Sequence, residues 1–491
     1  MKLRPRLILP PSSFLLEEGR DNAAATPFCK TRTVGSIVPP LPHYFAKLHK
    51  PVGKPSTHFN GFRPARDGWL RRVGLSSLWL LAARLAGQAL GLLFTAAIAR
   101  SLGQAGLGQF AFISAVVLIG NAATTFGLDT LLIRDVAAAR AAPDEAASSV
   151  PQTISAVLLI QLTLAAVFVA GLWLLAPRLP NQSPDTLPAL RLAALALFPL
   201  AFSTVDSALL RAHERMGHFL VFTLVTATAL ALGGLVLAIG GGGLTAAAGV
   251  FVVAQVAGAL AAAGLARRGL PGFRRRWVWP SSPVLGRALR LGAGLAALML
   301  LSLLYQRSGV LLLSLLEGDA AAGAYSAAAR VVEALKMLPA AFFGAMFPIL
   351  AQGRRGDGSG RVYRRAFAAL LAVAVLLAAL TTALAGPIMA LLFGPGYESA
   401  AGALRLMAWS LPPTVVAFKL SFDLVVAGRE RAAAVSMALT LLIGGGLTAW
   451  LIGGYGLTGA ALGLVAGEVA QVAILKSVAN SGNRQPLEVG R

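Results

Sequence analysis

Apolar runs of about twenty residues recur along this chain of 491 residues, from residue 76 to residue 479. A helix of about 20 residues rises about 30 Å, which is the thickness of the hydrocarbon core of a bilayer. Because short polar loops separate the runs, they predict a polytopic membrane protein and not a large soluble core. The composition agrees, since 13% of the residues are charged against about 25% in ordinary soluble proteins.

The number of runs predicts an all-α protein of about twelve transmembrane helices. Several runs exceed the minimum length for a span, which fits tilted or kinked helices. Four prolines in or near the runs are expected to bend helices there: Pro199, Pro339, Pro412 and Pro413. The runs cover residues 76–99, 108–133, 153–176, 189–210, 219–239, 244–266, 291–314, 324–350, 366–385, 402–426, 432–451 and 458–478.

The N-terminal segment 1–72 differs from the rest of the chain. It holds 13 lysines and arginines against four acidic residues and shows no apolar period. This composition predicts a basic, disordered cytoplasmic tail. A start codon assigned too far upstream and a tail that binds a membrane surface are the alternatives.

Arginine and lysine in alternate loops set the orientation, because cytoplasmic loops carry the excess of positive charge. One set of loops holds 18 such residues and the other set holds only Arg100 and Arg178. The first set of loops is therefore expected to be cytoplasmic, and so are both termini. The membrane is expected to be the cytoplasmic (plasma) membrane. The net charge of +23 is spread over the loops and the tail and is not gathered in one domain. This distribution argues against a nucleic-acid partner.

No enzyme motif stands out. The five histidines lie in the tail or in one loop, and Cys29 is the only cysteine, so neither a disulfide framework nor a thiolate metal site is expected. The segment "GKPST" (53–57) ends like a phosphate loop, but Leu48 stands where that motif needs glycine. We therefore expect a protein that is not an enzyme.

The chain repeats itself at a spacing near 215 residues. "AHERMG" (212–217) falls opposite "GRERAA" (428–433), and "GLTAAAG" (243–249) falls opposite "GLTGAAL" (456–462). A third pair, "LGQAGLGQF" and "EGDAAAGAY", shares two glycines five apart and an aromatic two residues later: Gly103, Gly108 and Phe110 in one copy, and Gly318, Gly323 and Tyr325 in the other.

Three matches in order, at nearly one offset, predict two copies of a six-helix unit. Because six is even, both copies have the same orientation and are expected to be related by an axis along the membrane normal, with a central cavity between them. The expected organisation is a tail (1–72), a first bundle (73–266), a basic cytoplasmic linker (267–290), a second bundle (291–479) and a cytoplasmic tail (480–491).

The segment "GLLFTAAIARSLGQAGLGQFAFISAVVLIGNAATTFGLDTLLIRDVA" (91–137) resembles the first two helices of a flippase family. This is the polysaccharide-export branch of the multidrug/oligosaccharidyl-lipid/polysaccharide (MOP) superfamily, which includes the O-antigen and teichuronic-acid (Wzx-type) flippases. "GAYSAAARVVEAL" (323–335) and "GLTGAALG" (456–463) resemble the starts of helices 8 and 12. The resemblance covers about residues 72–478 and implies a MATE-like fold. Where this family often has an acidic residue beside a basic one in helix 7, this chain has Gln306-Arg307.

Charged residues inside the apolar runs are candidate functional residues. A charge at the bilayer centre costs about 2.5–3.5 kcal/mol on insertion scales, so it normally faces the bundle interior or a wet cavity. Arg330, Glu333 and Lys336 fall within an arc of about 120° on one helix, where they can pair with one another. Lys419 and Asp423 can pair across one turn. Arg84 and Asp129 belong to the first two runs.

After such pairing, surplus positive charge is expected from Arg84, Arg307 and either Arg330 or Lys336. Arginine matches phosphate oxygens in a bidentate geometry, so the surplus indicates an anionic ligand. The predicted substrate-binding residues are Arg84, Gln306, Arg307, Arg330 and Lys336. The predicted ion-coupling or structural pairs involve Asp129, Glu333, Lys419 and Asp423.

We therefore expect a flippase for a polyprenyl-pyrophosphate-linked oligosaccharide that works by alternating access. A cation-coupled multidrug exporter of the same fold and a lipid II flippase are the alternatives. The expected partners are the lipid-linked oligosaccharide, membrane lipid and further polysaccharide-assembly proteins. No cofactor is expected, while coupling to H+ or Na+ stays open. One chain holds both halves of a cavity, so a monomer suffices.

Overall fold

The computed structural model describes residues 66–141, 150–178, 180, 183–270, 277–337, 339, 342, 359–426 and 429–482. These residues form helices and turns, and none of them forms a strand, so the all-α prediction is confirmed. Most of the predicted tail 1–72 lies outside the described residues. The first helix, α1 (Arg66–Thr125), begins ahead of the predicted start of the first span at residue 76.

In the described part of the chain, eight helical stretches are long and apolar enough to cross a membrane. Two of them, in α1 and in α16 (Glu430–Gly482), are each two helices joined at a glycine with non-helical dihedral angles. Two further predicted runs, at 324–350 and 402–426, correspond to α10 (Asp319–Leu335) and to α14 (Glu398–Ala408) with α15 (Leu411–Val426). Each of the twelve runs thus has a helical counterpart, although run 324–350 lies largely outside the described residues after residue 337. The chain is a multi-pass membrane protein.

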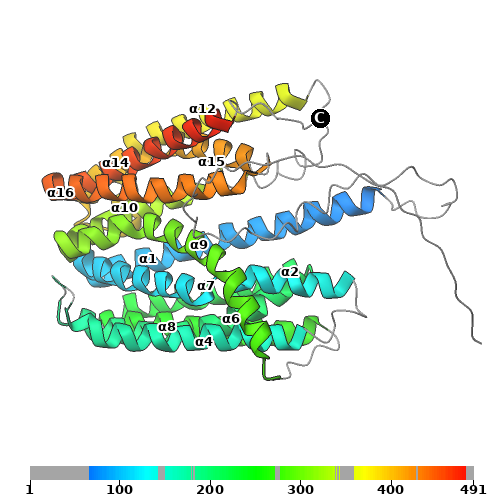
Figure 1. Ribbon diagram of the computed structural model, residues 1–491. Helices are drawn as coiled ribbons and strands as arrows, with labels where there is room; N and C mark the ends of the chain where they lie inside the picture. Colours follow the sequence, from blue (N-terminus) through cyan, green and yellow to red (C-terminus); the bar gives the residue numbers. More distant parts are fainter. Residues whose placement is uncertain are drawn as a thin grey trace, which may run out of the picture. The chain divides into compact units, whose positions relative to one another are not determined.

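The helices form two groups, which meet where α1 packs along α10. The helices up to α8 pack on one another, as do α10, α12, α14, α15 and α16. Figure 1 shows the cyan and green helices together on one side, the yellow to red helices on the other, and α1 and α10 between them. The remaining elements are α2 (Leu128–Ala141), α4 (Val150–Leu175), the 3-10 turn η2 (Ala176–Arg178), α5 (Thr186–Ala194), α6 (Leu197–Ala212), α7 (Met216–Gly240), α8 (Leu244–Gly269), α9 (Ser282–Leu316), α12 (Ser359–Ala383) and α13 (Ala385–Phe393).

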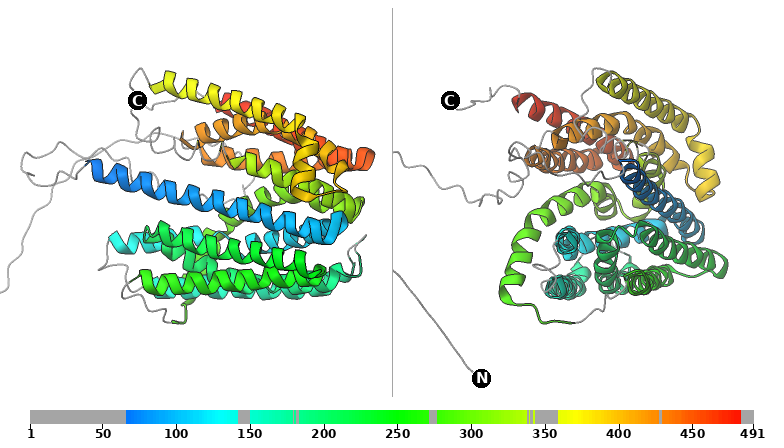
Figure 2. Two further views of the ribbon diagram at one scale, coloured as in Figure 1. Left: turned by 180° about the vertical axis from the view of Figure 1, so that it is seen from behind. Right: turned by 90° about the vertical axis from the view of Figure 1, so that its right-hand side faces the viewer.

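Helix α9 connects the two groups. It contacts α2 and α4 of the first group and α16 of the second. In the right-hand view of Figure 2 it curves around the cyan and green helices before it reaches the other group. The same helix therefore carries residues of the second half of the sequence to the middle of the bundle.

The helix breaks repeat with the sequence. The break between α5 and α6 falls at Leu195, and the break between α14 and α15 falls 214 residues later at Trp409. Each break has a proline four residues on, Pro199 and Pro413, and proline has no N–H to donate to the carbonyl of the break residue. The two prolines thus divide equivalent membrane spans at equivalent positions.

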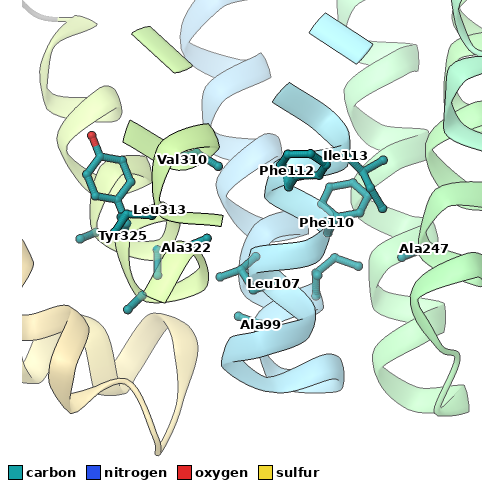
Figure 3. Packing of buried hydrophobic residues seen from close by; sticks show 14 of the residues in the cluster. Ala99, Leu107, Phe110, Phe112, Ile113, Ala247, Val310, Leu313, Ala322 and Tyr325 are labelled. Atoms are coloured by element: carbon teal, nitrogen blue, oxygen red, sulfur yellow. The ribbon is translucent and has the colours of Figure 1, made fainter. Parts of the chain in front are cut away.

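Apolar packing joins α1 to both groups. Figure 3 shows Leu107 and Phe110 of α1 lying between Ala322 of α10 on one side and Ala247 of α8 on the other. Outward-facing side chains are apolar too, since Ile239 is 81% exposed and Trp450 is 72% exposed. Such exposure would be costly in water and fits a surface that faces lipid.

Candidate functional site

A cavity of about 520 Å³ lies among α1, α9, α10, α15 and α16, which is within the usual range of ligand pockets. Most of its lining comes from the second half of the sequence, and α1 contributes Gln88, Ala111 and Ser114. Its charged lining residues among those described are three basic and two acidic: Arg307, Arg330, Lys336, Glu333 and Glu468.

Glu333 joins two arginines from different helices. Its Oε1 lies 3.2 Å from Nη1 of Arg307 on α9, and its Oε2 lies 3.3 Å from Nη1 of Arg330 on α10. Arg330 and Glu333 share a face because they are three residues apart on one helix. One carboxylate thus holds two guanidinium groups at the cavity wall.

Lys336 has its partner on another helix. Its Nζ lies 2.6 Å from Oε1 of Glu468 on α16, and Glu468 is only 8% exposed. The expected pairing of Lys336 along its own helix with Glu333 is therefore wrong. After both acids are paired, the described lining carries a net charge of +1, which is smaller than the surplus predicted from the sequence.

Several polar groups at the cavity have unused hydrogen-bonding capacity. A guanidinium has five N–H donors, and Arg307 gives only one of them to Glu333. The Nε of Arg307 and the hydroxyl of Tyr305 are buried atoms with no hydrogen-bond partner among the described residues. Buried polar groups are normally satisfied, so these two atoms beside the cavity are exceptions among the described residues.

The sequence did not single out Tyr305. Its ring packs against Gly444 and Gly467 of α16, where an added Cβ would meet ring atoms or the hydroxyl. The neighbouring Gln306 lines the cavity and donates to Ser302 Oγ at 3.1 Å. The sequence signal for Tyr305 is its position two residues before Arg307 in the same apolar run.

The other predicted site residues lie away from the cavity. Arg84 is exposed and is not among the lining residues. Lys419 Nζ and Asp423 Oδ2 are 2.6 Å apart, and Asp423 also accepts a hydrogen bond of 3.4 Å from the Tyr363 hydroxyl. Asp129 lies 3.3 Å from Arg211. These ion pairs lie outside the cavity lining, which fits a structural role better than a role in substrate binding.

Two glycines bring α1 and α10 into backbone contact. A Cβ built on Gly108 would lie 1.8 Å from the carbonyl oxygen of Asp319, and one built on Gly323 would lie 1.8 Å from that of Gln104. No side chain fits at either position, so the two helices cross at the closest approach their backbones allow. The distribution of arginine predicts that this crossing lies on the external side.

Hydrogen bonds surround the glycine crossing. The Oδ2 of Asp319 accepts from Ser183 Oγ at 2.7 Å and from Gln109 Nε2 at 3.0 Å. Gln104 Nε2 donates to the carbonyl of Ala320 at 2.9 Å and to Ser399 Oγ at 3.2 Å. These bonds tie the first half of the sequence to the second at the predicted external end. Among the described residues, no group of His, Cys, Asp or Glu could hold a metal ion.

The sequence profile of a family described as polysaccharide biosynthesis protein matches residues 73–354, more than half of the chain. No curated protein sequence is significantly similar to the chain. Solved structures resemble a larger share of the chain than the family profile matches. Because their sequence identity to the chain is low, they establish the fold alone.

Three solved structures illustrate the resemblance. An inward-facing multidrug-resistance MATE transporter of the MOP superfamily has a TM-score of 0.66 at 18% identity, over 82% of this chain and 96% of that one. The lipid II flippase MurJ, inward closed, has a TM-score of 0.64 at 13% identity, over 84% and 88%. A MOP transporter from Pyrococcus furiosus, described as having a binding pocket of reversed polarity, has a TM-score of 0.59 at 16% identity, over 85% and 97%. The predicted MATE-like fold is therefore confirmed.

Proposed function

Because the chain belongs to the polysaccharide biosynthesis protein family and has the fold of MOP transporters, we propose that it is a membrane flippase. Its substrate is a polyprenyl-pyrophosphate-linked oligosaccharide. It moves the pyrophosphate and sugars through its cavity and across the cytoplasmic membrane, while the lipid tail stays in the bilayer. Alternating access fits a bundle made of two repeated units.

The observation that carries this proposal is the pair of arginines at the cavity wall. Arg307 and Arg330 share the single carboxylate of Glu333, and each arginine donates only one N–H group to it. Arginine binds phosphate oxygens through two parallel N–H groups. Two guanidinium groups held side by side can therefore receive the two phosphates of a pyrophosphate.

A cation-coupled multidrug exporter is the first alternative, because a MATE transporter shares the fold. An exporter of cationic drugs needs a surplus of acidic groups in its cavity, whereas three bases face two acids in this one. The fold does not decide pocket charge, since one relative is described as having reversed pocket polarity. The charge of the lining therefore favours an anionic substrate.

A lipid II flippase is the second alternative, because MurJ shares the fold. Lipid II also contains a pyrophosphate, so the two arginines do not separate these substrates. The match to the polysaccharide biosynthesis family favours the oligosaccharide. Translocation assays with both lipids decide between them.

The test is translocation in proteoliposomes, read by a lectin or glycosidase that reaches only the outer leaflet. Wild-type protein should move a polyprenyl-pyrophosphate oligosaccharide, whereas Arg307→Glu and Arg330→Glu should reduce the rate at least tenfold. Arg290→Glu is the matched control, because Arg290 is an exposed residue near the start of the same helix as Arg307. Export of a cationic dye without movement of any such lipid would contradict the proposal.

A further inference from the structure

Arg134 and Arg287 share one carboxylate oxygen on the outside of the bundle. The Oδ1 of Asp135 lies 3.6 Å from Nε of Arg134 on α2 and 3.1 Å from Nη2 of Arg287 on α9. The two arginine side chains are 61% and 53% exposed, whereas that of Asp135 is 15% exposed. These three side chains therefore carry a net charge of +1, and the positive groups are the exposed ones.

The predicted orientation of the chain places this group at the cytoplasmic surface. Arg134 belongs to the arginines that are expected on that side, and it follows the glycine break at Gly103 by 31 residues. Helices of that length rise about 46 Å, which exceeds the hydrocarbon core of about 30 Å. With Gly103 at the predicted external end, Arg134 lies beyond the hydrocarbon, at the level of the lipid headgroups.

Two exposed tryptophans precede α9. Trp277 is 48% exposed and Trp279 is 75% exposed, and their rings meet edge to face with centroids 5.8 Å apart. The backbone N–H of Val278, between them, donates to Oγ of Ser155 on α4 at 3.2 Å, so the pair is attached to the bundle. Because tryptophan is enriched where membrane meets water, the pair indicates that the chain enters α9 at this interface.

The first half of α9 has a buried inner face and an apolar outer face. Ala288 belongs to a buried apolar cluster with Leu132 and Val136 of α2, whereas Leu289 and Met299 are each 43% exposed. The right-hand view of Figure 2 shows α9 curving around the outside of the first group. A basic group with exposed apolar side chains on the same helix matches the two parts of a phospholipid, the headgroup and the acyl chains.

We propose that Arg134 and Arg287 bind the phosphate of an anionic phospholipid in the cytoplasmic leaflet. Both arginines are more than half exposed, so they can donate further N–H groups to phosphate oxygens. The single negative charge of a phosphodiester balances the net charge of +1 of the group. A headgroup that also carries an amine would bring a positive charge to the arginines, so the site favours a lipid without one, such as phosphatidylglycerol.

The test measures the quenching of tryptophan fluorescence by lipid. The purified full-length chain in detergent micelles is titrated with phosphatidylglycerol or phosphatidylcholine that carries bromine on its acyl chains. Wild type should reach half-maximal quenching at an at least about fivefold lower mole fraction of phosphatidylglycerol. The double variant Trp277→Phe/Trp279→Phe should lose this difference, because the fluorescence that reports the site is removed.

Two further variants separate a site from diffuse surface charge. Arg134→Gln/Arg287→Gln should respond to both lipids alike, and its unchanged quenching by phosphatidylcholine shows that it is folded. Arg215→Gln is the matched control, because Arg215 is an exposed arginine on the same predicted side of the membrane, directly before α7. It should keep the preference of wild type for phosphatidylglycerol.

Three outcomes overturn the proposal. Wild type that is quenched equally by the two lipids has no anionic-lipid site among the tryptophans. A preference that survives in the double arginine variant, or that falls as much in Arg215→Gln, does not come from Arg134 and Arg287. Complete displacement of phosphatidylglycerol by soluble glycerol phosphate would assign the arginines to a free phosphate and not to a lipid.

Discussion

Gly108 and Gly323 lie at one crossing of two helices, and each presents its bare Cα to the backbone of the other helix. The contacts are reciprocal: Gly108 meets the carbonyl of Asp319, and Gly323 meets that of Gln104. Both relationships follow the same offset of 215 residues. The two halves therefore meet symmetrically at this crossing, and if the proposed flippase works by alternating access, we expect the bundle to open there.

A side chain at the crossing should separate α1 from α10; we call the arrangement in which their backbones touch the closed state. Gly108→Val places a Cβ 1.8 Å from a carbonyl oxygen, which the helices can relieve only by moving apart. In protein with Cys29→Ser, a disulfide formed by an added oxidant between Gln104→Cys and Ser399→Cys reports the closed state, because Nε2 of Gln104 donates to Oγ of Ser399 there at 3.2 Å. We expect Gly108→Val to lower the yield of that disulfide at least tenfold.

Gly91→Val controls for the general effect of valine in α1. Its Cβ would meet nothing within 4 Å, so the disulfide should form as in the parent protein. Gly323→Val should act like Gly108→Val because its Cβ meets a carbonyl at the same distance. Full disulfide formation with valine at either crossing position would contradict the role assigned to these glycines.

Asp319→Ala should weaken the same closed state more mildly. It removes the acceptor of two hydrogen bonds, from Ser183 and Gln109, each worth about 0.5–1.5 kcal/mol. A loss of about 1–3 kcal/mol shifts the open-to-closed ratio by about 5- to 150-fold. The rate of disulfide formation in the Gln104→Cys, Ser399→Cys background measures the shift, and an unchanged rate would show that these bonds do not hold the crossing closed.

Local patterns in the sequence predict much of this fold. The apolar runs define the spans because a helix must be apolar over about 20 residues to cross a bilayer. The matching glycines at Gly103 and Gly318 predict the repeat, and both adopt a positive φ with nearly the same ψ, −172° and −176°. These features depend on neighbouring residues, so the sequence alone reveals them.

The details of the cavity depend on contacts that the sequence does not specify. Lys336 pairs with Glu468, which is 132 residues away, whereas the sequence suggested Glu333 because it is one turn away. Arg84 has the same chemical character as Arg307, but it lies one helical turn before Gln88, the nearest residue of α1 that lines the cavity, and is itself exposed. The partner and direction of a charged side chain follow from helix packing, which periodicity does not fix.

The pair between Lys336 and Glu468 should behave as one unit. Both side chains are largely buried, and removing one partner leaves a charge unpaired. We expect Lys336→Met and Glu468→Gln each to lower the stability of the purified protein by about 1–3 kcal/mol, read as a lower Tm in detergent. The double variant should recover most of that loss, whereas additive losses would show that the two charges are not coupled.

Gly467 leaves room for the hydroxyl of Tyr305 beside the cavity. A Cβ at position 467 would lie 2.4 Å from that hydroxyl, so Gly467→Val should push Tyr305 toward Arg307 and reduce translocation at least tenfold, at a stability cost of about 1–3 kcal/mol. Gly446→Val on the same helix is the control, because its Cβ would meet nothing within 4 Å. Adding Tyr305→Phe removes the clashing oxygen and should restore part of the rate. Wild-type translocation by Gly467→Val would mean that the position of Tyr305 does not matter to the substrate.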